Sequence, residues 1–212
     1  MRPGERWTIG ALCGLVIAGA AAAPVGAYEH RRDTPSVGVQ IQMGNLGRDS
    51  DWGKAFGWGR GVCIHLRNST ARNRAIGLTF EQQRFDIESP LPEDIESGLP
   101  TSLLQMQTLL FDYLFYFQRP QRRCYYAVAS AGFYRPELVY ERRTQAGQPM
   151  TSDVRYPGEN FMGRIGGGTE YFVSRKFSFD GSISFYYLRA PDLHGLTASV
   201  QFALGVHVYA GR

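Results

Sequence analysis

The sequence predicts an all-β protein in which eight antiparallel strands follow one another, up and down, around a closed barrel. Three observations predict this class. Segments that alternate apolar with small or polar residues recur along the chain, as expected for strands with one apolar face. The connections between these segments are long and short in turn. Glycine and aromatic residues are abundant, with 25 Gly, 12 Tyr and 13 Phe in 212 residues, which favours strands and tight turns over helices.

The first four strands are expected at residues 37–44, 58–67, 75–83 and 102–117. The first reads VGVQIQMG, with valine, isoleucine and methionine on one side and glycine and glutamine on the other. The second and third alternate in the same way. The fourth, SLLQMQTLLFDYLFYF, is longer and less regular, and a buried helix is the alternative. Its aromatic residues and β-formers favour a strand.

The last four strands are expected at residues 123–134, 160–173, 176–187 and 196–208. The segment RCYYAVASAGFY is small and aromatic on both faces, so its two sides cannot be assigned. In 176–187, phenylalanine, isoleucine and tyrosine alternate strictly with serine and aspartate. The final segment, LTASVQFALGVHV, alternates leucine, valine and phenylalanine with threonine, serine, glutamine, glycine and histidine.

The lengths of the connections sort by position along the chain. In an up-and-down meander, the first, third, fifth and seventh connections lie at one end and the others lie at the opposite end. Short turns at one end and long loops at the other are typical of outer-membrane barrels. The long connections are 45–57, 84–101, 135–159 and 188–194, and the short ones are 68–74, 118–122 and 174–175.

The character of the two strand faces indicates which one contacts lipid. The less apolar face carries threonine, serine, glutamine, glycine and alanine with few charges, which suits the crowded interior of an eight-stranded barrel. The apolar face of the last three strands extends over about nine to eleven residues, the length of a transmembrane β-strand. The sequence therefore predicts a transmembrane barrel with its apolar face outward. A soluble lipocalin-like barrel, whose apolar face would line a ligand pocket, is the alternative.

Aromatic residues flank the basic turns at the short-turn end. Rings in this position are typical of the girdle where a membrane meets water. The expected girdle consists of Phe117, Tyr125, Tyr126, Tyr171, Phe177 and Tyr209.

Residues 1–27 are expected to be a cleaved signal peptide. Arg2 and Arg6 precede an apolar run, and Val25-Gly26-Ala27 is a small-residue cleavage site. A retained transmembrane helix is the alternative, disfavoured by the glycines of the run and by Pro24. Residues 28–35 would then form an N-terminal segment and residues 36–212 the barrel.

These patterns resemble the small eight-stranded outer-membrane β-barrels, the family of the OmpA transmembrane domain and its barrel-only relatives. The resemblance is carried by SAGFYRPEL at 130–138 and by the tight hairpin GGGTEYFVSRKFSFDGSISFYYL at 166–188. It implies export through the periplasm to the outer membrane of a Gram-negative-type bacterium. It also implies insertion by the barrel-assembly machinery and contact with outer-membrane lipid and lipopolysaccharide.

Strand parity predicts a polar cluster inside the barrel. Charges in a narrow lumen must pair, because an unpaired buried charge is costly. We expect a side-chain-filled lumen and a structural, surface-contact role, with a narrow ion or small-solute channel as the alternative. The cluster consists of Glu81, Asp112, Arg164, Glu170 and Asp180, with Arg67 as an additional candidate.

Enzymatic and cofactor chemistry is not expected. Lipid-A deacylases share the eight-stranded barrel, but their H-x-S pattern is absent at His65, His194 and His207. No cofactor or metal site is predicted, and Cys63 and Cys124 fall on strands that are not neighbours in a meander. A net charge of +4 is too small to indicate nucleic-acid binding.

Overall fold

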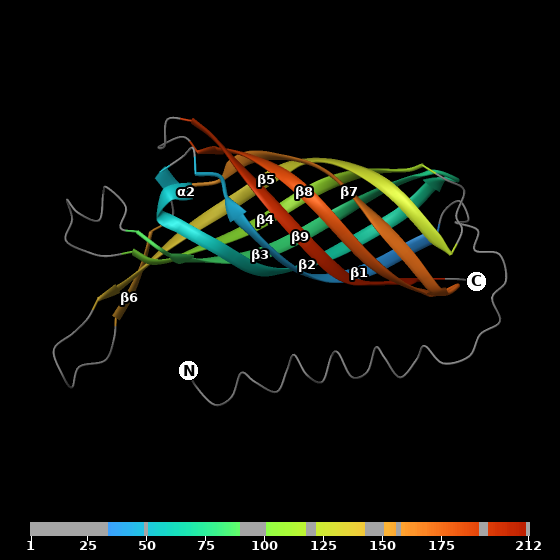
Figure 1. The fold of residues 1–212 in the computed structure, drawn as a ribbon, viewed down its shortest axis with the longest axis horizontal. Helices are drawn as coiled ribbons and strands as arrows, with labels where there is room; N and C mark the ends of the chain where they lie inside the picture. Colours follow the sequence, from blue (N-terminus) through green and yellow to red (C-terminus); the bar gives the residue numbers. More distant parts are fainter. Residues whose placement is uncertain are drawn as a thin grey trace, which may run out of the picture.

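The computed structural model describes residues 34–48, 51–89, 101–117, 122–142, 151–155, 158–190 and 195–210. The predicted signal peptide, residues 1–27, lies outside this range. Eight strands form the barrel, and a short strand and a short helix lie at one of its ends (Figure 1). The barrel strands are β1 (Thr34–Leu46), β2 (Phe56–Ala71), β3 (Arg74–Ile87), β4 (Thr101–Tyr116), β5 (Arg123–Arg142), β7 (Asn160–Ser174), β8 (Phe177–Ala190) and β9 (Gly195–Tyr209).

The barrel closes through pairing of the first strand with the last. The strands lie in the order β4-β3-β2-β1-β9-β8-β7-β5, and β4 also pairs with β5. Every pairing is antiparallel, and β1 pairs with β9 from Ser36↔Tyr209 to Leu46↔Ser199. The predicted eight-stranded up-and-down barrel is therefore confirmed.

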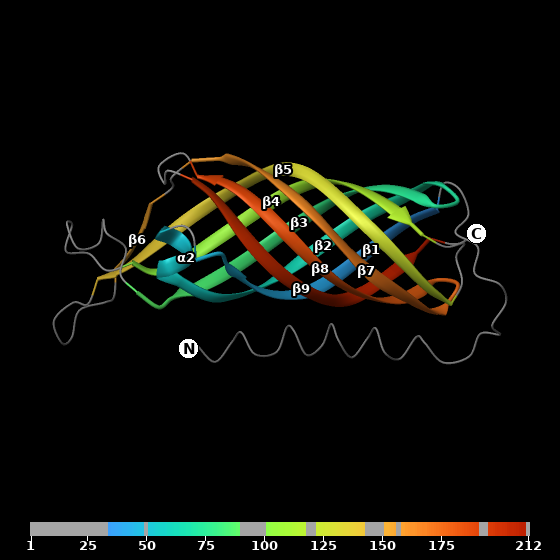
Figure 2. The same ribbon diagram turned by 45° about the horizontal axis from the view of Figure 1, so that its top comes forward.

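Most barrel strands extend beyond the predicted segments. The β2–β3 turn shortens to Arg72 and Asn73, and β5 continues to Arg142 through residues expected in a loop. The extension forms because β5 pairs both with β4 and with β6 (Thr151–Arg155), a strand that the sequence did not predict. Strand β6 reaches beyond the end of the barrel that carries the long connections (Figure 2).

The helix α2 (Asp51–Ala55) was not expected either. Trp52 and Ala55 of this helix are buried and join Phe56, Phe85 and Leu104 in an apolar cluster inside this end of the barrel. Five residues are too few to show helical periodicity in a sequence. Among the described residues, no helix combines the length and the apolar character needed to cross a membrane.

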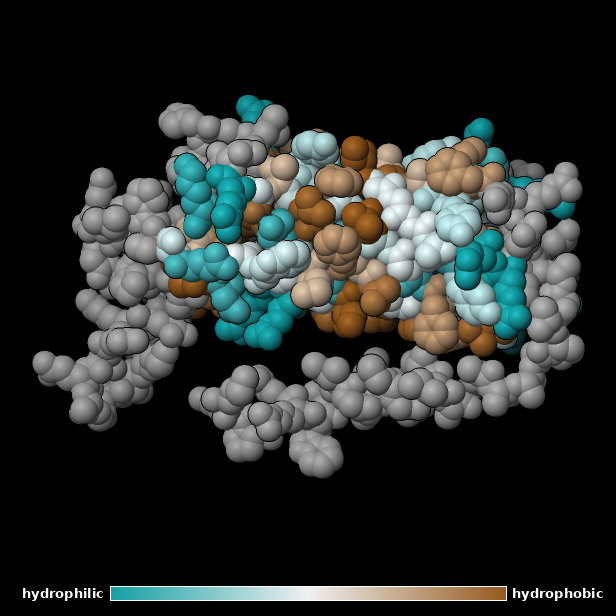
Figure 3. Space-filling view, in the orientation of Figure 1, coloured by the Kyte–Doolittle hydropathy of each residue, from teal (hydrophilic) through white to brown (hydrophobic). Residues whose placement is uncertain are grey.

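The distribution of polarity is inverted relative to a soluble protein. Large apolar side chains on every barrel strand point outward, including Ile41 and Leu204 at 65% exposure and Phe111 at 68%. Apolar residues occupy the middle of the visible surface, and hydrophilic ones gather toward the two ends (Figure 3). The interior is polar in the middle and apolar at both ends. The second apolar cluster, at the short-turn end, includes Leu114, Tyr116, Cys124, Phe172 and Tyr209.

Candidate functional site in the barrel lumen

The five charged residues predicted to lie in the lumen all point inward. Glu81 comes from β3, Asp112 from β4, Arg164 and Glu170 from β7, and Asp180 from β8. Each is at most 6% exposed, because alternate residues of a strand face the same side. Arg67 of β2 is buried as well. The described interior thus carries four carboxylates and two guanidinium groups, and the structure divides them between two clusters.

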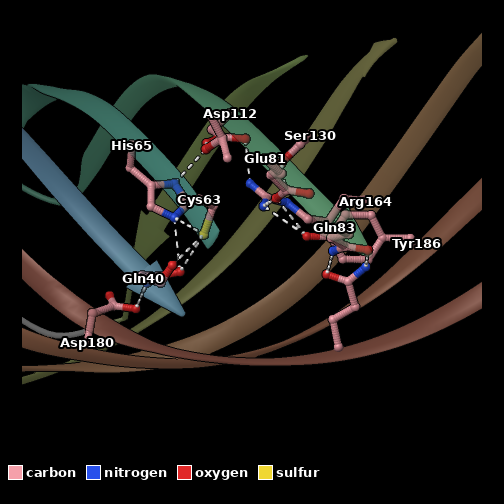
Figure 4. Close-up of polar contacts among 12 residues, drawn as sticks. Gln40, Cys63, His65, Glu81, Gln83, Asp112, Ser130, Arg164, Asp180 and Tyr186 are labelled. Atoms are coloured by element: carbon pink, nitrogen blue, oxygen red, sulfur yellow. Dashed lines mark hydrogen bonds and ion pairs between the residues drawn. The ribbon is translucent and has the colours of Figure 1, made fainter. Parts of the chain in front are cut away.

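The first cluster is centred on Arg164. Its guanidinium nitrogens donate to Glu81 Oε1 at 2.8 Å and to Asp112 Oδ1 at 2.6 Å, and its Nε donates to Ser130 Oγ at 3.0 Å. Tyr186 donates its hydroxyl to Glu81 at 2.8 Å. One cation therefore links two carboxylates on β3 and β4, strands that β5 separates from β7 (Figure 4). We call these residues the Arg164 cluster.

The second cluster surrounds Glu170 and Asp180. Glu170 accepts hydrogen bonds from the hydroxyls of Ser178, Tyr209 and Tyr116. Asp180 accepts from Tyr126 at 2.9 Å and from the amide of Gln40, and its other oxygen lies 3.5 Å from Arg67. This cluster has two carboxylates and one guanidinium group, so the hydroxyl and amide donors supply the remaining hydrogen bonds that stabilise the carboxylates. These residues form the Glu170–Asp180 cluster.

Neutral residues that were not predicted to belong to the lumen cluster connect the two clusters. His65 Nδ1 lies 2.6 Å from Thr79 Oγ1, and Thr79 donates to Asp112 of the first cluster. His65 Nε2 lies 2.9 Å from the side-chain oxygen of Gln40, whose amide reaches Asp180 (Figure 4). These residues share the inward parity of their strands. That parity is a signal in the sequence, but it does not distinguish them from other inward residues.

The middle of the lumen is filled by side chains. Gln83 and Gln201 hydrogen-bond each other reciprocally across the barrel. A cavity of about 20 Å³ remains among residues that include Gln40, His65 and Arg164. A space of this size holds roughly one water molecule. With apolar clusters at both ends, the interior has the character of a packed core with a polar centre.

The predicted aromatic girdle is partly wrong. Phe117 and Tyr125 are 63% and 44% exposed, and Tyr171 and Phe177 are half-buried on the outer side. Tyr126 and Tyr209, in contrast, are only 3% and 5% exposed and point into the lumen, where their hydroxyls bind Asp180 and Glu170. Adjacent strand residues face opposite sides, so Tyr125 and Tyr126 cannot both lie on the outer surface.

The cysteine and histidine side chains of the described residues are buried inside the barrel. Cys63 and Cys124 are both buried and do not form a disulfide. His65 and His207 are buried in the lumen, and His194 lies outside the described residues. Within the described part of the chain, no group of three or more histidine, cysteine, aspartate or glutamate side chains is placed to hold a metal ion.

Comparison with solved structures gives the same architecture. The chain is similar to the Neisserial surface protein A, with a TM-score of 0.56 and 12% identity over 82% of this chain and 96% of that one. It is similar to a major outer membrane protein from Thermus thermophilus, with a TM-score of 0.55 and 11% identity over 82% and 99% of the two chains. It is also similar to Ail, the attachment invasion locus protein of Yersinia pestis, with a TM-score of 0.52 and 15% identity over 84% and 99%.

The chain has the fold of the small eight-stranded outer-membrane β-barrels. No family model matches the chain, and no curated protein matches it. At identities of 9–15%, the likeness to OprG from Pseudomonas aeruginosa and to the proteins above is one of fold.

Proposed function

We propose that this protein is an integral outer-membrane β-barrel with a closed lumen, whose role is structural support and contact at the cell surface. The belt of outward apolar side chains supports this proposal, together with an interior in which every predicted charged residue is buried and contacts a charged or polar partner. In water, a belt of this size would favour aggregation. In a bilayer, hydrocarbon covers it, and the closed barrel satisfies the backbone hydrogen bonds.

The packed lumen supports a structural role over a conducting one. An eight-stranded barrel has an interior just wide enough for side chains to fill. Here the Arg164 cluster, the Glu170–Asp180 cluster and the two apolar clusters fill it. Structured elements at the long-loop end, α2 and the β5–β6 hairpin, support a surface-contact role because they extend the protein beyond the belt. Lipopolysaccharide and the barrel-assembly machinery are the partners proposed for this location.

Three measurements test the proposal. The folded protein should require detergent for extraction, and its migration on a gel should shift when the sample is boiled. In planar bilayers it should show no discrete conductance. A soluble, unshifted protein would contradict the membrane assignment and favour a lipocalin-like carrier.

A narrow channel is the second candidate, favoured by the row of charges along the lumen. It predicts discrete conductance steps that change in Glu170→Gln or Arg164→Gln, because charged groups lining a pore set its selectivity. Steps unchanged by both substitutions would point to a leak at the edge of the barrel.

A further inference from the structure

Strands β9, β1, β2, β3 and β4 lie side by side (Figure 1). A trough crosses their outer surface. Its volume is about 610 Å³. The register defines its walls, because partner residues on neighbouring strands line up in rows across the sheet. One wall is the row Leu204, Ile41, Val62 and Gln82, and the other is the row Phe202, Met43, Arg60, Arg84 and Gln105.

The floor of the trough is backbone. Gln42, Gly61 and Gln83 lie between the two rows, at the positions whose side-chain direction is into the barrel. The outward side chains of the two rows therefore stand on either side of a bare strip of sheet. The strip runs across the strands and, since transmembrane strands tilt by about 35–45°, it lies oblique to the membrane normal.

The two ends of the trough differ in chemistry and in depth. Phe202 and Leu204 lie near the middle of β9, within the apolar belt. Arg60 and Arg84 lie close to the ends of β2 and β3 that carry the long loops. On the outer face, the nearest large apolar residue on the side away from the loops is Val62 in β2 and Phe80 in β3. The apolar end of the trough is thus at the depth of hydrocarbon, and its basic end is at the level of the headgroups on the loop side.

Arg60 and Arg84 face each other across the β2–β3 pair. Like charges directly opposite on a sheet destabilise the pair. No ion pair or hydrogen bond to a carboxylate neutralises either guanidinium among the described residues, although Asp86 lies on the same face of β3. The nearby Arg135 differs, because it lies 3.9 Å from Glu137. An anion between Arg60 and Arg84 would relieve their repulsion, and paired guanidinium groups suit phosphate oxygens.

We infer that this trough is a binding site for one phosphate-bearing membrane lipid of the leaflet on the loop side. An acyl chain lies along the bare strip between the Leu204–Ile41–Val62 and Phe202–Met43 walls, and the phosphate lies between Arg60 and Arg84. Gln82 and Gln105 add polar groups at the headgroup end. The inference rests on the proposed membrane location and adds a defined lipid contact to it.

The natural reporter for the test is Trp58, which is 56% exposed on the outer face of β2, two residues from Arg60. The protein is inserted into phosphatidylcholine vesicles that contain a small, fixed fraction of brominated phosphatidylglycerol or, separately, the same fraction of brominated phosphatidylcholine. Bromine quenches tryptophan on contact. We expect stronger quenching by the anionic lipid. The preference should fall on the order of fivefold for each arginine removed, and Arg60→Gln/Arg84→Gln should abolish it.

The matched control is Arg48→Gln/Arg189→Gln, which removes two exposed charges at the same end of the barrel, outside the trough. It should retain the preference. Equal quenching by both lipids in the unmodified protein would overturn the inference, as would an equal loss in the control pair. Complete reversal by inorganic phosphate in the buffer would also overturn it, because it would show an anion site that does not need a lipid.

Each variant is first checked for the gel shift on boiling. A shifted, inserted protein without lipid preference contradicts only the lipid site. A protein that neither shifts nor inserts contradicts the proposed function itself.

Discussion

Individual lumen residues act through charge pairing in a space that water barely enters. Arg164 pairs with Glu81 and Asp112. The Arg164 side chain is 6% exposed and each carboxylate side chain is 1% exposed. Removing one partner from such a group leaves uncompensated buried charge, which costs far more than the loss of a surface pair.

Arg164→Met should therefore lower the free energy of unfolding by about 3–5 kcal/mol, because two buried carboxylates lose their cation. Urea unfolding of the protein in detergent micelles measures the change. The control is Arg135→Met, because the Arg135 side chain is 45% exposed and its Nε lies 3.9 Å from Glu137 Oε1. Exposed pairs contribute about 0–1 kcal/mol, so equal effects of the two variants would contradict the buried cluster.

Tyr125 and Tyr126 provide a comparison of neighbouring residues. Tyr126→Phe removes the hydroxyl that donates to Asp180 at 2.9 Å and leaves a buried acceptor with one partner fewer. This should cost about 1–3 kcal/mol. Tyr125→Phe removes a hydroxyl from an exposed ring and should change the unfolding free energy little. The same urea titration measures both variants. A larger effect at Tyr125 would mean that Tyr125 faces the lumen and that Tyr126, its neighbour on the strand, faces outward in the girdle.

At the scale of the element, glycines determine how closely side chains pack across neighbouring strands. Gly38 of β1 is the partner of His207 on β9, and the imidazole ring occupies the space where a β-carbon of residue 38 would lie. Such a β-carbon would be 2.2 Å from His207 Cε1. The strand pair therefore admits the histidine only because residue 38 has no side chain.

Gly38→Ala should destabilise the barrel by about 1–3 kcal/mol through overpacking. Gly163→Ala is the matched control, because the nearest atom to its β-carbon would be the Ser130 carbonyl oxygen at 3.9 Å. Replacement there should be neutral or slightly stabilising, since alanine restricts the unfolded chain. The temperature of the boiling-induced gel shift ranks the two variants, and the reverse order would contradict the packing of β1 on β9.

For the whole molecule, folding depends on the solvent around the belt. The inside-out distribution of polarity means that the barrel buries its polar centre and leaves its apolar side chains for lipid. The stability of the folded barrel therefore depends on lipid or detergent that covers the outward apolar side chains.

Dilution from urea into detergent micelles or short-chain lipid vesicles should give a β-sheet circular dichroism spectrum and a gel shift. Dilution into buffer alone should give aggregation, because the exposed belt has no cover. A monomeric, β-rich species in plain buffer would contradict the lipid-facing assignment.

Much of the barrel could be predicted because strand alternation is local. The inward positions of Glu81, Asp112, Arg164, Glu170 and Asp180 follow from parity alone. Parity also predicts an inward Tyr209, since Leu204 and Val208 on the other parity of β9 face outward. The girdle prediction is wrong at Tyr209 because the two-residue alternation of the strand, and not the position of the ring at a strand end, sets the direction of the side chain. Parity gives no such signal for Tyr126, since its strand is small and aromatic on both faces.

The sequence by itself determined the eight strands, their up-and-down order and the outward apolar face, because these depend on a two-residue period and on connection length. Only the tertiary structure decided that Arg164 pairs with Glu81 and Asp112, that α2 packs its Trp52 into one end and that Arg60 lies opposite Arg84 beside a trough. Arg164 and its carboxylate partners lie on strands far apart in the chain, and even the neighbouring β2 and β3 bring Arg60 opposite Arg84 only in one register. Register and barrel closure set which residues meet, and neither is encoded in the periodicity of a single segment.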